Sequence, residues 1–125
     1  YGWLSSRGIG AEDFVLICLP RDARPFIAIL GVWKAGAAFT VVEADYAPER
    51  IEAILADCGC RLTIDASAWE EILKTEPKAG FKQADDHDAC FAIYTSGSTG
   101  KPKGVLQEYG KIKLTRLPWS RAPAT

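Results

Sequence analysis

The sequence contains no methionine, a single histidine and no apolar run that approaches the length of a membrane-spanning helix. Such a helix needs about 20 consecutive apolar residues, so we expect no contact with a membrane. The chain opens at Tyr1 with neither an initiator methionine nor a signal segment. We therefore interpret it as an internal segment of a longer, cytoplasmic protein.

An excess of charge of one sign is also missing, because 15 basic and 16 acidic residues give a formal net charge of −1. No overall positive field is available to attract nucleic acid, and we expect no nucleic-acid partner. From Lys111 onward the basic residues meet no acidic partner, and prolines interrupt any helix. We predict one domain over residues 1–110, and over 111–125 a basic tail that is either disordered or foreign to the natural reading frame.

Motifs for metal or redox chemistry are scarce as well. Cys18 and Cys90 lie in apolar runs, and the spacing of Cys58 and Cys60 is C-x-C rather than C-x-x-C. Buried, reduced thiols are the favoured interpretation. The sole histidine, His87, lies among aspartates and indicates a solvated surface side chain, so we predict no metal site.

What the sequence does contain is an alternation of short apolar runs with helical periodicity. Strands are predicted at 14–19, 38–42, 61–64 and 89–94, and the first of these is continuously apolar without polar alternation, as in a fully buried strand. Helices are predicted with Pro25 in the first turn of one and Pro48 at the first position of another, and they end at Gly36 and Gly59. A short helix is predicted around 69–73, and a charged surface loop over 75–88.

This order predicts an α/β fold with a mainly parallel sheet flanked by helices. In the first of the long helices, Phe26, Ile29, Leu30 and Trp33 recur at helical spacing and form one apolar face.

Chemistry is concentrated in residues 94–105, YTSGSTGKPKGV, which follow the last predicted strand. The glycines Gly97, Gly100 and Gly104 allow the backbone to approach an anion closely. Hydroxyl donors come from Thr95, Ser96, Ser98 and Thr99, and Lys103 adds a positive charge. These properties favour a phosphate-binding loop over a plain surface turn.

Two common nucleotide motifs are excluded in this stretch. Pro102 follows Gly100-Lys101, where a P-loop has serine or threonine, and Thr95 stands where that motif begins with glycine. The spacing of Gly97 and Gly100 does not match the G-x-G-x-x-G fingerprint of dinucleotide-binding folds.

Residues 94–105 resemble the signature loop of the adenylate-forming superfamily without interruption. Two further stretches, LGVWKAGAAF (30–39) and YAPERI (46–51), are similar to segments of amino-acid adenylation domains of nonribosomal peptide synthetases. The second resemblance favours amino-acid activation, and we expect these two stretches to have a packing role. Two departures stand out: 41–44 is VVEA where the family has Pro-x-Asp-Pro, and Tyr109 replaces a common histidine.

The resemblance implies specific roles for the loop. Residues 95–100 would surround the β- and γ-phosphates of ATP, with Mg²⁺ as the counter-ion, and Lys103 would act catalytically on the departing pyrophosphate. The implied phosphate-binding residues are Thr95, Ser96, Gly97, Ser98, Thr99, Gly100, Lys103 and Gly104. The implied product is an aminoacyl-adenylate, which a carrier-protein domain then receives.

Residues 1–110 would then form part of the N-terminal subdomain of such an enzyme. The family's side-chain pocket, adenine-binding segment, ribose-binding aspartate and late lysine all follow the signature loop, so we expect the chain alone to be inactive. We also expect a second copy, or the remaining adenylation-domain segments, to cover an exposed apolar edge. A non-catalytic nucleotide or pyrophosphate-binding module and a non-functional truncated remnant are the alternatives.

Overall fold

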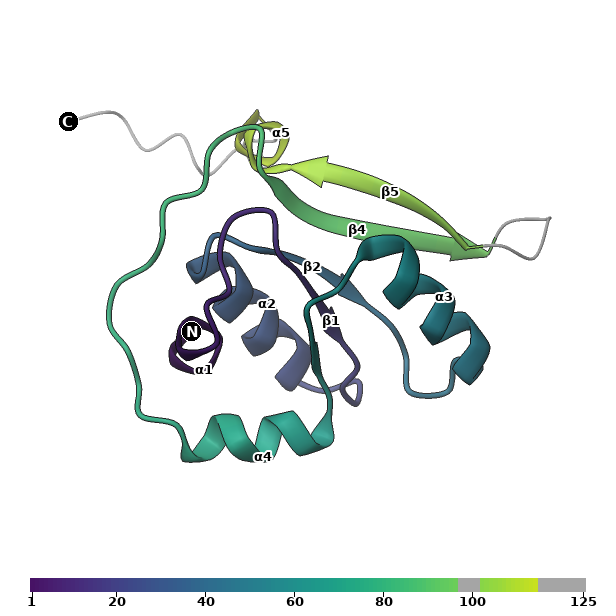
Figure 1. Ribbon diagram of the computed structural model, residues 1–125, viewed down its shortest axis with the longest axis horizontal. Helices are drawn as coiled ribbons and strands as arrows, with labels where there is room; N and C mark the ends of the chain where they lie inside the picture. The colour runs from purple at the N-terminus through teal and green to yellow at the C-terminus, as the bar shows by residue number, and fades with distance from the viewer. Residues whose placement is uncertain (97–101, 115–125) are drawn as a thin grey trace.

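The computed structural model describes residues 1–96 and 102–114 as one five-stranded sheet with helices on both faces (Figure 1). The strand order is β3-β1-β2-β4-β5, and every pairing is parallel except that of β4 with β5. The strands are β1 (Phe14–Ile17), β2 (Ala38–Val41), β3 (Leu62–Ile64), β4 (Ala89–Ser96) and β5 (Pro102–Glu108). The predicted fold class is confirmed, and each predicted strand is present.

The helices are α1 (Gly2–Ser6), α2 (Arg24–Lys34), α3 (Pro48–Cys58), α4 (Ala66–Lys74) and α5 (Tyr109–Leu114). The predicted ends of α3 are confirmed: Pro48 begins the helix, and Gly59 closes it in the left-handed conformation with φ 63°. Patterns of the sequence did not indicate α1, β5 or α5. The predicted boundary at residue 110 falls within α5 and stays a prediction, while 115–125 lie outside the described residues.

The parallel connections determine which helix lies on which face. Because such crossovers are right-handed, the forward connections through α2 and α4 cover one face and the backward connection through α3 covers the other. The two buried clusters agree with this arrangement. Val15 and Ile17 of β1 pack with α1, α2 and α4, whereas Leu16 packs with Val42 and with Ile54 of α3.

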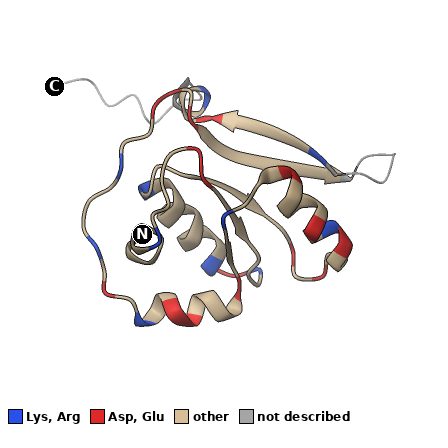
Figure 2. Ribbon diagram, in the orientation of Figure 1, with Lys and Arg blue, Asp and Glu red and all other residues tan. Residues whose placement is uncertain are grey.

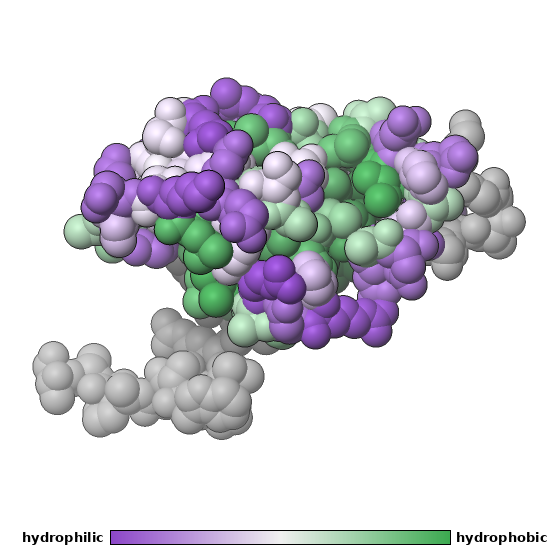
Figure 3. Space-filling model, turned by 90° about the horizontal axis from the view of Figure 1, so that it is seen from below, coloured by the Kyte–Doolittle hydropathy of each residue, from purple (hydrophilic) through white to green (hydrophobic). Residues whose placement is uncertain are grey.

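The apolar face predicted on α2 is present, but two of its four residues are open to solvent. Phe26 is 70% exposed and Leu30 is 59% exposed, whereas Ala28 and Val32 of the same helix are buried. Ile29 packs against the buried cluster, so Phe26 and Leu30 form the open side of this face. Figure 3 shows that hydrophobic surface is open to solvent between hydrophilic stretches when the molecule is seen from below.

The predicted surface loop at 75–88 has neither helix nor strand and runs along the outside of the molecule from α4 to β4 (Figure 1). It is attached to α2 by a hydrogen bond from the Lys82 amide to the Lys34 carbonyl oxygen, with a length of 2.7 Å. Among the described residues no helix is both long and apolar enough to cross a membrane.

The isolated position of α3 makes its core contact testable. Ile54 is fully buried, so Ile54→Ala leaves a cavity and is expected to lower the free energy of unfolding by about 2–5 kcal/mol. Leu73→Ala on α4 is the control, because Leu73 is 65% exposed and its truncation should have little effect. Urea unfolding measures both, and equal losses in the two variants would contradict the assignment of Ile54 to the core.

Candidate functional site at the β4–β5 hairpin

The signature stretch begins on β4 with residues 94–96 and ends on β5 with residues 102–105. Thr95 lies directly opposite Lys103, and Ser96 opposite Pro102. Opposed residues of an antiparallel pair share a face of the sheet, so Thr95 and Lys103 point the same way. The predicted residues Gly97, Ser98, Thr99 and Gly100 lie outside the described residues.

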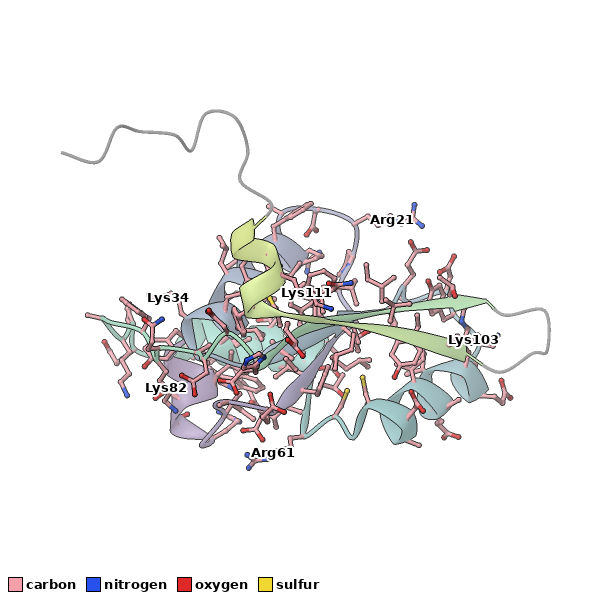
Figure 4. The ribbon with its side chains drawn as sticks, turned by 90° about the horizontal axis from the view of Figure 1, so that it is seen from above. Arg21, Lys34, Arg61, Lys82, Lys103 and Lys111 are labelled. Atoms are coloured by element: carbon pink, nitrogen blue, oxygen red, sulfur yellow. The ribbon has the colours of Figure 1, made fainter. Side chains whose placement is uncertain are left out.

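Lys103 is exposed near the start of β5, at the end of the strand pair where Figure 4 labels it. Its ammonium group makes no hydrogen bond or ion pair with residues 1–96 or 102–114. Figure 2 shows that α3, the helix on the other face of the sheet, carries several acidic residues. Since no described carboxylate pairs with Lys103, its ammonium group is available to bind an anion from solution.

Gly104 has a packing role that the sequence did not indicate. A Cβ added at Gly104 would lie 2.8 Å from Cζ and 3.0 Å from Cε1 of Tyr94. Such distances are far below van der Waals contact, so the Tyr94 ring occupies the space that any larger residue at position 104 would need. Tyr94 is also the direct partner of Gly104 in the β4–β5 register.

The Tyr94 ring then reaches from the hairpin to α3. Its hydroxyl donates a hydrogen bond to Oδ2 of Asp57 at 2.5 Å, near the C-terminal end of that helix. Burial, and then the hydrogen bond to Asp57, raise the pKa of Tyr94 well above its usual range, so the phenol keeps its proton. The base of the signature loop is therefore fixed to α3 by one side chain.

Cys58 and Cys60 lie at the same end of α3, and each thiol is partly exposed. The hydrogen bond from the Cys60 thiol lowers the pKa of Cys58 to about 7, against the opposing effects of burial and of Asp57. Tyr94 also contacts Cys58, but its single hydroxyl hydrogen is directed to Asp57. The same thiol pair, together with burial, raises the pKa of Cys60.

The other two cysteines differ from this pair. All four are free, and burial raises the pKa of Cys90 to about 11 and also raises that of Cys18. Only Cys90 is fully buried, so the prediction of four buried thiols was wrong for the other three. Their side chains lie at the ends of elements, where packing is incomplete.

The structure also shows where the side chains of His87 and Tyr109 lie. The side chain of His87 is 96% exposed and lies 3.5 Å from Glu108, which confirms the predicted surface position. Tyr109 is half-buried, and its hydroxyl donates to the Ala37 carbonyl oxygen at 2.5 Å. Burial raises the pKa of Tyr109 above its ordinary value, so this phenol serves as a neutral tie between α5 and the start of β2.

A broad apolar groove lies beside the hairpin on the α2 side of the sheet. Its walls are large side chains of α2 facing those of β2 and β4, where Phe39 stacks on Phe91 with ring centroids 5.7 Å apart. The groove is lined by Phe26, Ile29, Leu30, Trp33, Phe39, Val41, Tyr46, Phe91, Ala92, Ile93 and Tyr94. It combines an exposed helix face with an exposed strand face.

Comparison with known proteins assigns this architecture to a class. Residues 2–117 match the family described as AMP-binding enzyme, and the chain belongs to that family. The fold is similar to the N-terminal subdomain of NpsA from Klebsiella oxytoca, solved in complex with anthranilyl-AMSN. That match has a TM-score of 0.79 and 26% identity, and it covers 93% of this chain and 33% of the solved one.

The curated relatives are nonribosomal peptide synthetases. The chain is 36% identical over 135 aligned positions to cyclosporin synthetase of Tolypocladium inflatum, a match that covers 91% of this chain and 1% of that protein. It is 34% identical over 128 positions to surfactin synthase subunit 2 of Bacillus subtilis, covering 87% and 4%. The resemblance to synthetase adenylation domains is confirmed, and the chain spans a small part of these relatives.

The contact between Gly104 and Tyr94 gives a testable prediction. Gly104→Ala is expected to lower the free energy of unfolding by about 1–3 kcal/mol, because the added methyl group displaces the Tyr94 ring. The matched background is Tyr94→Ala, in which the ring is absent and the same glycine substitution should have little further effect. A double-mutant cycle by urea unfolding measures the coupling, and additive losses would contradict the contact.

Proposed function

We propose that this chain is the ATP-phosphate-binding part of an adenylation domain that activates an amino acid for nonribosomal peptide synthesis. One observation carries the proposal: the paired strands that begin and end the signature stretch place Lys103 opposite Thr95, and Lys103 is free of any described protein anion. Family membership and the synthetase relatives support the same activity.

The described residues fit a polyphosphate. Thr95 and Lys103 share one face of the hairpin, so a hydroxyl and an ammonium group can approach the same anion. Gly97, Ser98, Thr99 and Gly100, which lie between the two strands in the sequence, add hydroxyl and backbone N–H donors, and Ser96 at the end of β4 adds another hydroxyl. Gly104 is included because its contact with Tyr94 holds the start of β5 in place. The proposed phosphate-binding residues are Thr95, Ser96, Gly97, Ser98, Thr99, Gly100, Lys103 and Gly104.

ATP supplies the AMP that becomes bonded to the amino-acid carboxylate as pyrophosphate leaves. Lys103 would hold its ammonium charge against the phosphate oxygens on which negative charge increases as that bond breaks. The Tyr94 contact with Asp57 would keep this lysine in a constant position relative to the sheet. A fixed charge stabilises the transition state more than a mobile one, since no reorganisation is then required.

Enzymes of this family use Mg²⁺ with ATP, and the proposed ion would neutralise the triphosphate. Among the described residues no group of three or more His, Cys, Asp or Glu side chains is placed to hold a metal. Mg²⁺ is usually held by substrate phosphate oxygens and water with one or two carboxylates.

The apolar groove is proposed as the surface against which the remaining segments of the adenylation domain pack. The chain accounts for 33% of the NpsA subdomain chain that it matches, so much of that fold lies outside the matched region. A carrier-protein domain would receive the activated amino acid, as in the synthetase relatives. When the 125-residue chain is studied alone, we propose that a second copy covers the groove.

Nucleotide titration of Lys103→Ala tests the phosphate site. A charge-assisted hydrogen bond contributes about 1.5–3 kcal/mol, so the variant should bind ATP and pyrophosphate about tenfold or more weakly than the unmodified chain. Lys74→Ala is the control, because Lys74 is an exposed lysine at the end of α4, and binding should be unchanged. Calorimetry with each ligand and Mg²⁺ provides the measurement.

Three outcomes distinguish a phosphate-binding chain from an active enzyme and from a non-functional remnant. Binding that depends on Lys103, without amino-acid-dependent exchange of labelled pyrophosphate into ATP, is expected for the chain alone. Exchange clearly above the Lys103→Ala background would show that the chain is active by itself. If ATP and pyrophosphate both fail to bind, the proposed phosphate site is wrong for this chain and a non-functional remnant is favoured.

Self-association is tested by sedimentation over a range of protein concentrations. Leu30→Ser places a polar group in the groove and should shift the chain toward monomer. Leu73→Ser is the matched control, since Leu73 is an equally exposed helix leucine outside the groove lining. If the unmodified chain remains monomeric at every concentration, pairing of two copies through the groove is excluded.

A further inference from the structure

We propose that Cys58 and Cys60 form a dithiol site that reacts with small disulfides of the glutathione class, closing a Cys58–Cys60 disulfide beside Tyr94. Neither cysteine belongs to the signature stretch, and the adenylation chemistry proposed above uses neither thiol. The inference therefore stands or falls independently of the proposed function.

The backbone brings the two thiols together at the end of α3. Gly59 adopts φ 63° and ψ 40°, and the amides of Gly59 and Cys60 both donate to the Leu55 carbonyl oxygen at 3.0 and 3.3 Å. This left-handed turn folds Cys60 back toward the last helical residue, Cys58. Two residues that flank one glycine are at most about 7 Å apart even in an extended chain, and this turn shortens that span into the range of about 4.4–6.8 Å that a disulfide bridges between Cα atoms.

A reagent can also reach the pair. A Cβ added at Gly59 would find no heavy atom within 4 Å, so the turn between the two cysteines faces open space. Both thiols are partly exposed, whereas Cys90 is fully buried. Accessibility and proximity together single out this pair among the four cysteines.

The chemistry favours Cys58 as the attacking group. Its pKa is lowered by the hydrogen bond from Cys60, so near neutral pH it is more often a thiolate than an ordinary cysteine. The Cys58 thiolate attacks one sulfur of the small disulfide and releases the other half as a thiolate. Cys60 then loses its proton, attacks Cys58 of the mixed disulfide and releases the second thiolate, so the reagent gains the two electrons that the protein loses.

The position of the pair links this reaction to the hairpin. Tyr94 contacts Cys58 while its hydroxyl is bonded to Asp57, and its ring packs on Gly104. Closing the disulfide removes the Cys60 thiol hydrogen and moves the Cys58 sulfur toward Cys60. The environment of the Tyr94 ring, and with it the base of the hairpin tip, is therefore expected to depend on the oxidation state.

The test exposes the reduced 125-residue chain to glutathione and glutathione disulfide, followed by acid quench, alkylation and peptide mass spectrometry. The peptide holding Cys58 and Cys60 is expected to lack two hydrogens and to resist alkylation, while Cys18 and Cys90 are alkylated once the chain is denatured. A reduced peptide, glutathione spread over all four cysteines, or only disulfides between chains would overturn the proposal.

Two serine variants separate the roles of the thiols. Cys60→Ser should accumulate glutathione on Cys58, because the mixed disulfide has no second thiol to resolve it, and Cys58→Ser should form no internal disulfide. Failure of Cys60→Ser to take up glutathione on Cys58 would overturn the assignment of Cys58 as the attacking thiol. Disulfide mapping of the unmodified chain decides the main proposal even if a variant fails to fold.

Amide hydrogen exchange tests the link to the hairpin. Oxidation should change exchange in β4 and β5 near Tyr94 and Gly104, and the change should be largely lost in Tyr94→Phe, which lacks the hydroxyl bonded to Asp57. Identical exchange in the reduced and oxidised chains would overturn the link.

Discussion

The parallel pairing of β1 with both β2 and β3 is the constraint on which the other features of this fold depend. Parallel neighbours cannot be joined by tight turns, so each connection must cross a face of the sheet, and a helix makes each crossing. The chain moves forward from β1 to β2, back to β3 and forward again to β4. Because of that reversal, α3 lies on the face of the sheet opposite α2 and α4.

The position of α3 in turn determines where the signature stretch is held. Its C-terminal end carries Asp57 and Cys58, which meet Tyr94 as β4 approaches the hairpin tip. The missing side chain at Gly104 lets the Tyr94 ring pack directly against β5. One residue thus joins a helix, two strands and the proposed phosphate site, and the proposed dithiol lies against the same ring.

The opposite face explains the open groove. The helix α2 has small residues against the sheet and large apolar residues pointing away, so it is apolar on two sides. A helix of that kind is normally covered on both sides, by the sheet and by a further layer. The groove between α2 and the exposed strand faces is where such a layer would lie, and it borders β4, the strand that leads to the signature stretch.

Elements that carry their own local signals were readable from the residues alone. Continuous apolar runs indicated β1 to β4, Pro48 and Gly59 marked the ends of α3, and the unbroken stretch at 94–105 indicated the family. Those signals are local because backbone propensity, capping and a contiguous motif depend on neighbouring residues. The strand β5 escaped prediction because Pro102 and Gly104 are poor strand formers, and pairing with β4 supplies its stability.

Which side chains meet was settled by the folding of the whole chain. The hydrogen bond between Tyr94 and Asp57 joins residues 37 positions apart, and no periodicity within either segment predicts it. The same is true of the Tyr94 ring over Gly104 and of Thr95 facing Lys103, which follow from the register of the hairpin. The exposed face of α2 was likewise decided by packing, because a helix with two apolar sides presents no sequence signal for which side is buried.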